Sequence, residues 1–317
     1  MAISDRYKSY YRGWNVKHFY SFYRRQHRGN RSYTWVKETL QKAGAVKRAK
    51  KRGAHRKKRE RSPMEGMMLH QDGSTHEWVS GQKWDLIVTM DDATSEHYSM
   101  FFTEQEGTAS SFQGLKETIE KKGLPCSLYT DRGSHYWFTA EAGGKVDKVN
   151  LTQFGRAMQQ LGIEMIPAYS PEARGRSERA FGTHQGRLPK ELAAQGITSM
   201  GEANRYLRKV YMKHFNAEFA VKASCENSAF VDWMGESLDD ILCEHHERVV
   251  GKDNCVSFEG MKLQIPQDRY RCHYLKVKVR LHRYANGDLA IFHGPRKLAQ
   301  YDMEGNVRAN KCQKKAA

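Results

Sequence analysis

The chain has 317 residues, and its 53 lysine and arginine residues outnumber its 36 aspartate and glutamate residues, for a formal net charge of +17. Its isoelectric point is about 9.5 and its mean hydropathy is −0.80. This length leaves room for two or three domains, no apolar run approaches the roughly 20 residues of a membrane span, and the N-terminus lacks the apolar stretch of a secretory signal. The positive charge favours a polyanionic partner. Without a basic amphipathic helix or a lipidation signal, we expect that partner to be nucleic acid and not a membrane.

Residues 13–44 predict two helices joined by a tight turn. Asn15 is placed to cap the first helix, and Ser32 is placed to cap the second. Gly44 stands where a helix commonly ends. Helix, short turn and helix form the helix-turn-helix pattern, so we assign residues 1–46 to a DNA-binding segment of that kind. Its outward-facing candidate DNA contacts are Arg31, Thr34 and Lys37, with Glu38 and Gln41 beside them.

Residues 47–63 form a run of basic side chains, which we predict to be a solvated linker. Between a DNA-binding segment and the domain that follows, such a linker is expected to lie along a phosphate backbone, where each neutralised phosphate releases a counterion. Its candidate phosphate contacts are Lys47, Arg48, Lys50, Lys51, Arg52, Arg56, Lys57, Lys58 and Arg59.

Residues 64–220 alternate strands and helices in the order βββαβαβα. We expect strands at about 67–72, 84–91, 98–102, 127–130 and 164–166, and helices that begin near Thr108, Thr152, Ala173 and Ser199. Three antiparallel strands followed by helical crossovers are typical of a mixed α/β, ribonuclease-H-like core with a five-stranded mixed sheet. Pro189 should kink or end the helix that begins near Ala173.

The last third of the chain predicts a linker at 221–237, a small β-barrel at 238–305 and a tail at 306–317. Alternating apolar and basic residues between Lys276 and Leu281 indicate a strand with a basic outer face, and Asn286-Gly287 is a strong hairpin signal.

The six cysteines are scattered and form no C-x-x-C pair, which argues for a reducing cytosol and against a zinc ribbon or a disulfide framework. One stretch, Cys243-Glu244-His245-His246, brings metal-capable side chains together. Adjacent histidines rarely reach one ion, and no second pair lies at zinc-finger spacing. We therefore interpret this stretch as a polar helix end.

Three acidic residues border predicted elements. Asp72 ends the first strand, Asp131 ends the fourth, and Glu178 lies near the start of a helix, at the edge of its apolar stripe. Two carboxylates at strand ends and one on a helix can converge on a pair of Mg²⁺ or Mn²⁺ ions, which prefer carboxylate oxygens. Two such ions about 3.5–4 Å apart can hold both the attacking and the leaving oxygen of a phosphodiester exchange.

Four stretches together resemble the catalytic core of DDE transposases, and most of all bacterial insertion-sequence transposases of the ISNCY kind, which are related to retroviral integrases. The stretches are QDGS at 71–74, DDAT at 91–94, YTDR at 129–132 and, as the most specific, PAYSPEARGRSER at 167–179. The resemblance covers nearly the whole chain, including the predicted helix-turn-helix and β-barrel.

This resemblance implies that Asp72, Asp131 and Glu178 are the catalytic triad and hold two Mg²⁺ (or Mn²⁺) ions. Asp91 and Asp92 are rivals for the first carboxylate, but they end the second strand and not the first, so we assign them to a structural turn. Near the start of the Glu178 helix, phosphate contact and solvated surface are equally open interpretations. They apply to Arg174, Arg176 and Arg179.

As partners, the resemblance implies double-stranded DNA, both element ends and target, and a homodimer or higher oligomer on it, in a bacterial, cytoplasmic, nucleoid-associated protein. Two other interpretations stay open. In the first, the chain is a catalytically inactive or truncated DNA-binding protein derived from a transposase. In the second, it is a ribonuclease-H-like nuclease, which would need neither the helix-turn-helix nor the barrel.

Overall fold

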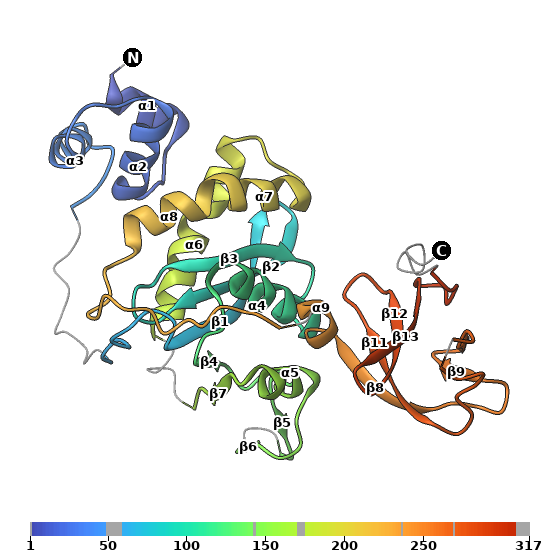
Figure 1. The fold of residues 1–317 in the computed structure, drawn as a ribbon. Coiled ribbons are helices and arrows are strands. Elements are labelled where there is room, and N and C mark those ends of the chain that lie inside the picture. Colours follow the sequence, from blue (N-terminus) through green and yellow to red (C-terminus); the bar gives the residue numbers. More distant parts are fainter. Residues whose placement is uncertain are drawn as a thin grey trace, which may run out of the picture.

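The computed structural model describes residues 2–48, 59–141, 144–169, 175–235, 237–268 and 270–308. They form an N-terminal helical unit, a central α/β core and a C-terminal β unit, in chain order (Figure 1). No helix among these residues is long and apolar enough to span a membrane.

The N-terminal unit holds three helices, α1 (Ile3–Tyr10), α2 (Val16–Gln26) and α3 (Tyr33–Lys42). Both predicted caps are present: the Asn15 side chain accepts from the Lys17 amide at 2.9 Å, and the Ser32 hydroxyl accepts from the Trp35 amide at 3.3 Å. Helix α1 was not predicted, because its sequence is mostly polar. A single buried residue fixes it, since the Tyr7 hydroxyl donates to the Trp14 carbonyl at 2.6 Å.

The core sheet has the order β3-β2-β1-β4-β7. Its strands are β1 (Met68–Val79), β2 (Gln82–Asp91), β3 (His97–Thr103), β4 (Ser127–Thr130) and β7 (Glu164–Pro167). The first three are antiparallel, and β4 and β7 continue parallel to β1. This confirms the predicted five-stranded mixed sheet of a ribonuclease-H-like core.

Strand β1 is longer than predicted. We expected it to end at Asp72, but it continues to Val79 as one arm of a hairpin with β2. Residues 73–77 are polar or glycine, so the apolar pattern of the strand stops there. Backbone pairing from Gly73 opposite Ile87 to Glu77 opposite Lys83 sustains the strand without that pattern.

Helices cover both faces of the sheet (Figure 1). Helices α4 (Thr108–Lys122) and α5 (Gln153–Leu161) pack on one face, and α6 (Gly175–Ala194), α7 (Met200–Tyr206), the π-helical turn η2 (Leu207–Tyr211) and α8 (Met212–Phe219) pack on the other. Helix α6 passes through Pro189 without ending, which corrects one of our two expectations for that residue. Leu188 and Leu192 are fully buried on either side of it, and their packing outweighs the lost backbone hydrogen bond.

Two connecting segments have more structure than expected. Between β4 and α5, a short hairpin pairs β5 (Phe138–Thr139) with β6 (Val146–Asp147). The segment predicted as the linker 221–237 lies back along the core, where the amide of Cys225 donates to the Pro63 carbonyl and the amide of Ala229 donates to the Glu65 carbonyl, each at 2.8 Å.

The C-terminal unit begins with α9 (Leu238–Ile241). Its strands are β8 (Glu244–Val249), β9 (Cys255–Phe258), β10 (Met261–Gln264), β11 (Lys278–Arg283), β12 (Leu289–His293) and β13 (Arg296–Tyr301). A four-stranded antiparallel sheet, β13-β12-β11-β8, and a two-stranded sheet, β10-β9, share one apolar core. Among the residues described between 237 and 308, no hydrogen-bonded ladder joins the two sheets, so closure into a barrel stays a prediction.

The N-terminal unit docks on the core through a buried carboxylate. Glu191 of α6 is paired with His18 Nε2 at 2.9 Å and accepts from Arg25 Nη2 at 2.8 Å, both on α2, and from the Tyr206 hydroxyl at 2.6 Å. Burial by itself would raise the pKa of Glu191, but the hydrogen bond from His18 and the charge of Arg25 outweigh it and lower that pKa. The ionised carboxylate therefore holds α2 against α6.

We expect Glu191→Gln to loosen this docking. The neutral amide leaves Arg25 without its buried counter-charge, which typically costs about 3–5 kcal/mol. Hydrogen exchange measured by mass spectrometry should show α2 losing protection while β1 and β2 keep theirs. Glu202→Gln on the exposed face of α7 is the control and should change neither region. Unchanged protection of α2 in Glu191→Gln would contradict the proposed role.

Candidate active site

Asp72 and Asp131 lie level with each other on neighbouring strands. In the parallel pairing of β1 with β4, Met68 stands opposite Ser127 and His70 stands opposite Tyr129. Continued two residues further along each chain, the same register would reach Asp72, which lies in β1, and Asp131, which directly follows β4. Side chains alternate along a strand, so the Asp72 carboxylate lies on the face on which the rings of His70 and Tyr129 meet, with their centroids 5.2 Å apart.

Helix α6 crosses this same face in the direction of β1. Near its start Arg176 contacts Asp92, at its middle Gln185 Nε2 donates to the Ser74 hydroxyl at 2.9 Å, and beyond its end the Thr198 carbonyl accepts from Gln82 at 3.0 Å. Because Asp92 and Gln82 lie at opposite ends of β2, the antiparallel partner of β1, these contacts place α6 along the length of the hairpin formed by the two strands.

The contact between Gln185 and Ser74 also sets the height of Glu178. Glu178 precedes Gln185 by two helical turns, about 10.5 Å along the axis, and Asp72 precedes Ser74 by about 7 Å along the strand. Glu178 therefore lies within about one residue of the level of Asp72. It is exposed beside the buried Ser177, at the edge of the apolar stripe, as predicted.

The two aspartates differ from Glu178 in burial. Asp72 is only 7% exposed and accepts from the Gly73 amide at 3.1 Å, while Asp131 is half-buried and accepts from the Gly133 amide at 2.9 Å. If the three carboxylates were to meet, as the sequence predicts, they would form a hard, oxygen-rich donor set. That set fits Mg²⁺ or Mn²⁺ and does not fit a soft metal.

Another acidic residue, Glu106, lies against β1 and was missed in the sequence. It packs against Gly73, because a Cβ on Gly73 would lie 2.2 Å from Glu106 Oε2, on the face opposite the Asp72 side chain. The pKa of the buried Tyr136 is raised well above its usual value, first by burial and then by the charges of Glu106, Asp72 and Asp131. No local pattern marks Glu106, which lies in the loop before α4.

Asp91 and Asp92 take structural positions, as expected of residues that end β2. Asp91 accepts from the Gly66 amide at 3.0 Å and from the Thr94 amide at 2.7 Å. Asp92 is fully buried and accepts from the Ser62 amide at 2.7 Å, with His70 Nε2 2.8 Å away. Two guanidinium groups complete its surroundings, those of Arg59 and Arg176.

The predicted DNA contacts differ in how exposed their side chains are. The side chain of Arg176 is 14% exposed and donates to Asp92 and to the Arg59 carbonyl, so its first role is to hold the start of α6. Exposed side chains are those of Arg31, Thr34, Lys37, Lys47, Arg48, Arg59 and Arg179. Outside the described residues lie Lys50, Lys51, Arg52, Arg56, Lys57, Lys58 and Arg174.

The comparisons with known proteins agree with this architecture. No family model matches the chain. It is 30% identical over 268 residues to the transposase y4bF of Sinorhizobium fredii, covering 81% of this chain and 58% of that protein. It is 30% identical over 236 residues to the transposase for insertion sequence IS1202 of Streptococcus pneumoniae, covering 74% of this chain and 50% of that protein. The chain thus spans about half the length of the curated relatives it matches.

Among solved structures, a chain of the simian T-cell lymphotropic virus intasome in complex with the PP2A regulatory subunit B56 gamma aligns at a TM-score of 0.42 and 14% identity, over 89% of this chain and 93% of that chain. The HTLV-2 integrase catalytic core domain in complex with magnesium aligns at 0.36 and 17%, over 46% and 87%. The relatives in sequence show that the chain belongs to the transposase family. One of these relatives is the transposase for insertion sequence IS1202.

Asp92→Asn should destabilise the core by about 3–5 kcal/mol, because it removes the only negative charge from a buried cluster with two arginines and His70 among the described residues. Asp239→Asn, which breaks the exposed pair with Lys116, should cost no more than about 0.5 kcal/mol. Both free energies of unfolding are measured by urea denaturation at pH 7.

The same cluster determines whether the stability contributed by Asp92 rises or falls with pH. Burial would raise the pKa of Asp92, but hydrogen bonds from His70 and Ser62 outweigh it and lower the pKa far below its usual range. A lowered carboxyl pKa stabilises the fold above the unfolded pKa of about 3.9, and that stabilisation is lost as pH falls through the folded value. The difference between wild type and Asp92→Asn should therefore shrink below about pH 4. A constant difference from pH 7 to pH 3 would contradict this account.

Proposed function

We propose that the chain is a DDE transposase that binds the ends of a mobile DNA element, cleaves a phosphodiester there and joins the freed 3′-hydroxyl to target DNA. What supports this proposal is that Asp72 lies in β1, Asp131 directly follows the neighbouring strand β4, and Glu178 lies on helix α6, which crosses β1, in a chain whose relatives are transposases. One phosphodiester is exchanged for another, so the reaction needs no ATP, and the sequence contains no G-x-x-x-x-G-K-S/T loop.

The three carboxylates would hold two Mg²⁺ (or Mn²⁺) ions, with Asp72 shared between them and Asp131 and Glu178 on either side. When bound, the ions would activate the attacking water or 3′-hydroxyl and stabilise the leaving 3′-oxygen. The chain itself supplies the positions. The parallel pairing of β1 with β4 supports a level position for the two aspartates, and the contact of Arg176 with Asp92 holds the start of α6, two residues before Glu178.

DNA binding is assigned to the N-terminal unit and the basic linker. Helix α3 exposes Thr34 and Lys37, beside the half-exposed Trp35, and Arg31 just before the helix places its guanidinium 5.0 Å from the centre of the Trp35 ring. Cations and polar groups on one face of a capped helix fit a DNA groove and its phosphates. A dimer or higher oligomer on DNA, and a cytoplasmic, nucleoid-associated location, stay predictions.

Each triad substitution should abolish cleavage and leave DNA binding intact. We expect Asp72→Asn, Asp131→Asn and Glu178→Gln each to lower Mg²⁺-dependent nicking of element-end DNA by at least about 10³-fold, since a two-ion site tolerates no missing ligand. Gel shifts in Ca²⁺ should show unchanged affinity. Glu202→Gln is the control and should nick normally.

The outcomes separate the competing functions. DNA binding without Mg²⁺-dependent nicking by the wild type favours an inactive or truncated transposase-derived regulator. Cleavage of an RNA–DNA hybrid in preference to element ends favours a ribonuclease-H-like nuclease. Full strand transfer by Glu178→Gln overturns the assignment of the third carboxylate.

Lys37→Ala on α3 should weaken binding to element-end DNA and reduce the slope of log K against log salt by about 1, because one phosphate contact is lost. Fluorescence anisotropy at several salt concentrations measures both quantities. Lys8→Ala, an exposed lysine on α1 of the same unit, is the matched control. If both variants lose affinity equally, α3 has no special role in contacting DNA.

A further inference from the structure

A second cluster of metal-capable side chains lies in the C-terminal unit, far from the carboxylates in sequence. The stretch that we interpreted as a polar helix end is strand β8, which pairs with β11 so that His245 stands opposite His282. Cys243 precedes His245 by two residues and adjoins the same pair. One potential ligand atom from each of these three residues lies within 4.8 Å of the other two.

His282 is the unusual member of this cluster. It is 3% exposed, and neither of its ring nitrogens has a hydrogen-bond partner among the described residues. Its ring is stacked between those of His245 and Phe292, with centroids 3.8 and 4.0 Å away. Stacking gives the two faces of the His282 ring their contacts, but it supplies no hydrogen bond to either ring nitrogen among the described residues. An unpaired buried polar group costs about 1–3 kcal/mol, so a ligand for one nitrogen would stabilise the fold.

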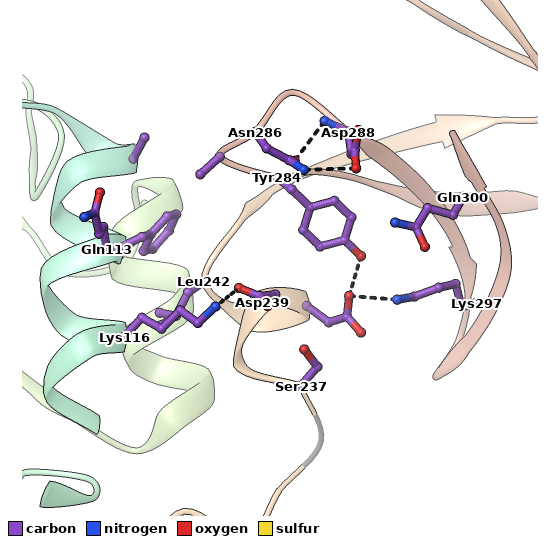
Figure 2. Close-up of a pocket in the computed structure, with 14 residues that line it drawn as sticks. Gln113, Lys116, Ser237, Asp239, Leu242, Tyr284, Asn286, Asp288, Lys297 and Gln300 are labelled. Carbon is purple, nitrogen blue, oxygen red and sulfur yellow. Dashed lines mark hydrogen bonds and ion pairs between the residues drawn. The ribbon is translucent and has the colours of Figure 1, made fainter. Parts of the chain in front are cut away.

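The other two side chains converge on a single backbone oxygen. The Asp240 carbonyl lies 3.5 Å from Cys243 Sγ and 3.0 Å from His245 Nε2. The side chain of Asp240 is fixed separately, at a cavity of about 420 Å³ between α4 and the C-terminal sheet. Figure 2 shows the Tyr284 hydroxyl and Lys297 Nζ meeting at its carboxylate. The carbonyl that faces Cys243 and His245 is thereby held in place.

We propose that Cys243, His245 and His282 form a zinc site, with the Asp240 carbonyl or a water in the fourth position. One thiolate and two imidazoles are a donor set for Zn²⁺ and exclude Mg²⁺, which takes oxygen ligands. The imidazole rings must turn toward the ion, and the ring torsion of histidine is soft enough to allow it.

One neighbouring cation has two opposite effects on this site. Arg156 of α5 donates to the Cys243 carbonyl at 2.6 Å and to the Ile241 carbonyl at 2.9 Å. Burial raises the pKa of the Cys243 thiol to about 12, and the charge of Arg156 offsets this rise only in part, so a bound metal would have to displace the thiol proton. The same charge repels a divalent ion, so the affinity is lower than that of a four-cysteine site.

The location gives the ion a structural role. Gln153 of α5 exchanges two hydrogen bonds with the backbone of His245, both at 2.9 Å, so the cluster sits where the core meets the C-terminal sheet. Zinc bound there would tie the beginning of β8 to β11 and fix the C-terminal unit on the core. This role is separate from the carboxylate site and does not depend on its chemistry.

The test uses the full chain carrying Asp72→Asn and Asp131→Asn, so that the carboxylate site does not contribute metal. After the protein is loaded with Zn²⁺ and desalted, inductively coupled plasma mass spectrometry should find about one zinc per chain. With Co²⁺ in its place, a thiolate-to-cobalt charge-transfer band should appear in the near ultraviolet. Cys243→Ser should abolish that band, and both Cys243→Ser and His282→Phe should lower zinc affinity by at least about tenfold.

Two variants serve as matched controls. His246→Gln alters the neighbouring histidine of β8, and Cys255→Ser alters a second cysteine of the same unit; both should keep the zinc and the band. Phenylalanine at position 282 preserves the ring stack, and circular dichroism verifies that each variant is folded. If the parent chain retains no zinc after desalting, or if the charge-transfer band survives Cys243→Ser, the proposal is overturned.

Discussion

The architecture of the candidate active site depends on one buried carboxylate, Asp92. It lies at the end of β2 and draws together a histidine of β1, the backbone of the basic linker at Ser62 and the first turn of α6 at Arg176. None of these groups is catalytic by assignment. Their common anchor, however, decides where α6 begins, and Glu178 lies two residues after Arg176. The charge cluster at Asp92 therefore fixes the start of the helix that carries Glu178, the proposed third carboxylate.

Most of this site could be predicted from the sequence, because its signals are local. Asn15, Ser32 and Thr152 were expected to start helices and do so, since a cap is decided within three residues. The apolar runs of β2 and β4 gave strands that pair as a ribonuclease-H-like sheet requires. Once that order is accepted, Asp72 and Asp131 must lie on adjacent strands, and only their register needs the structure.

What the sequence did not show depends on contacts between distant segments. The polar half of β1 is a strand because β2 pairs with it, and Pro189 stays inside a helix because buried leucines flank it. Glu106 packs against β1 only because Gly73 has no side chain. The pairing of His245 with His282 joins residues on two strands that are distant in sequence, so the spacing of residues near His245 does not reveal His282.

The acidic residues explain how so basic a chain can fold and still bind a polyanion. Asp92, Glu191 and Glu218 lie in the interior or at the contact of the N-terminal unit with the core, each beside one or more basic side chains. Such pairs join the linker, α2 and α8 to α6, where a charge without its partner would be costly. These three acids are thus engaged in holding the parts together. Lys37, Lys47 and Arg48 are exposed, where a phosphate backbone could reach them under the proposed function.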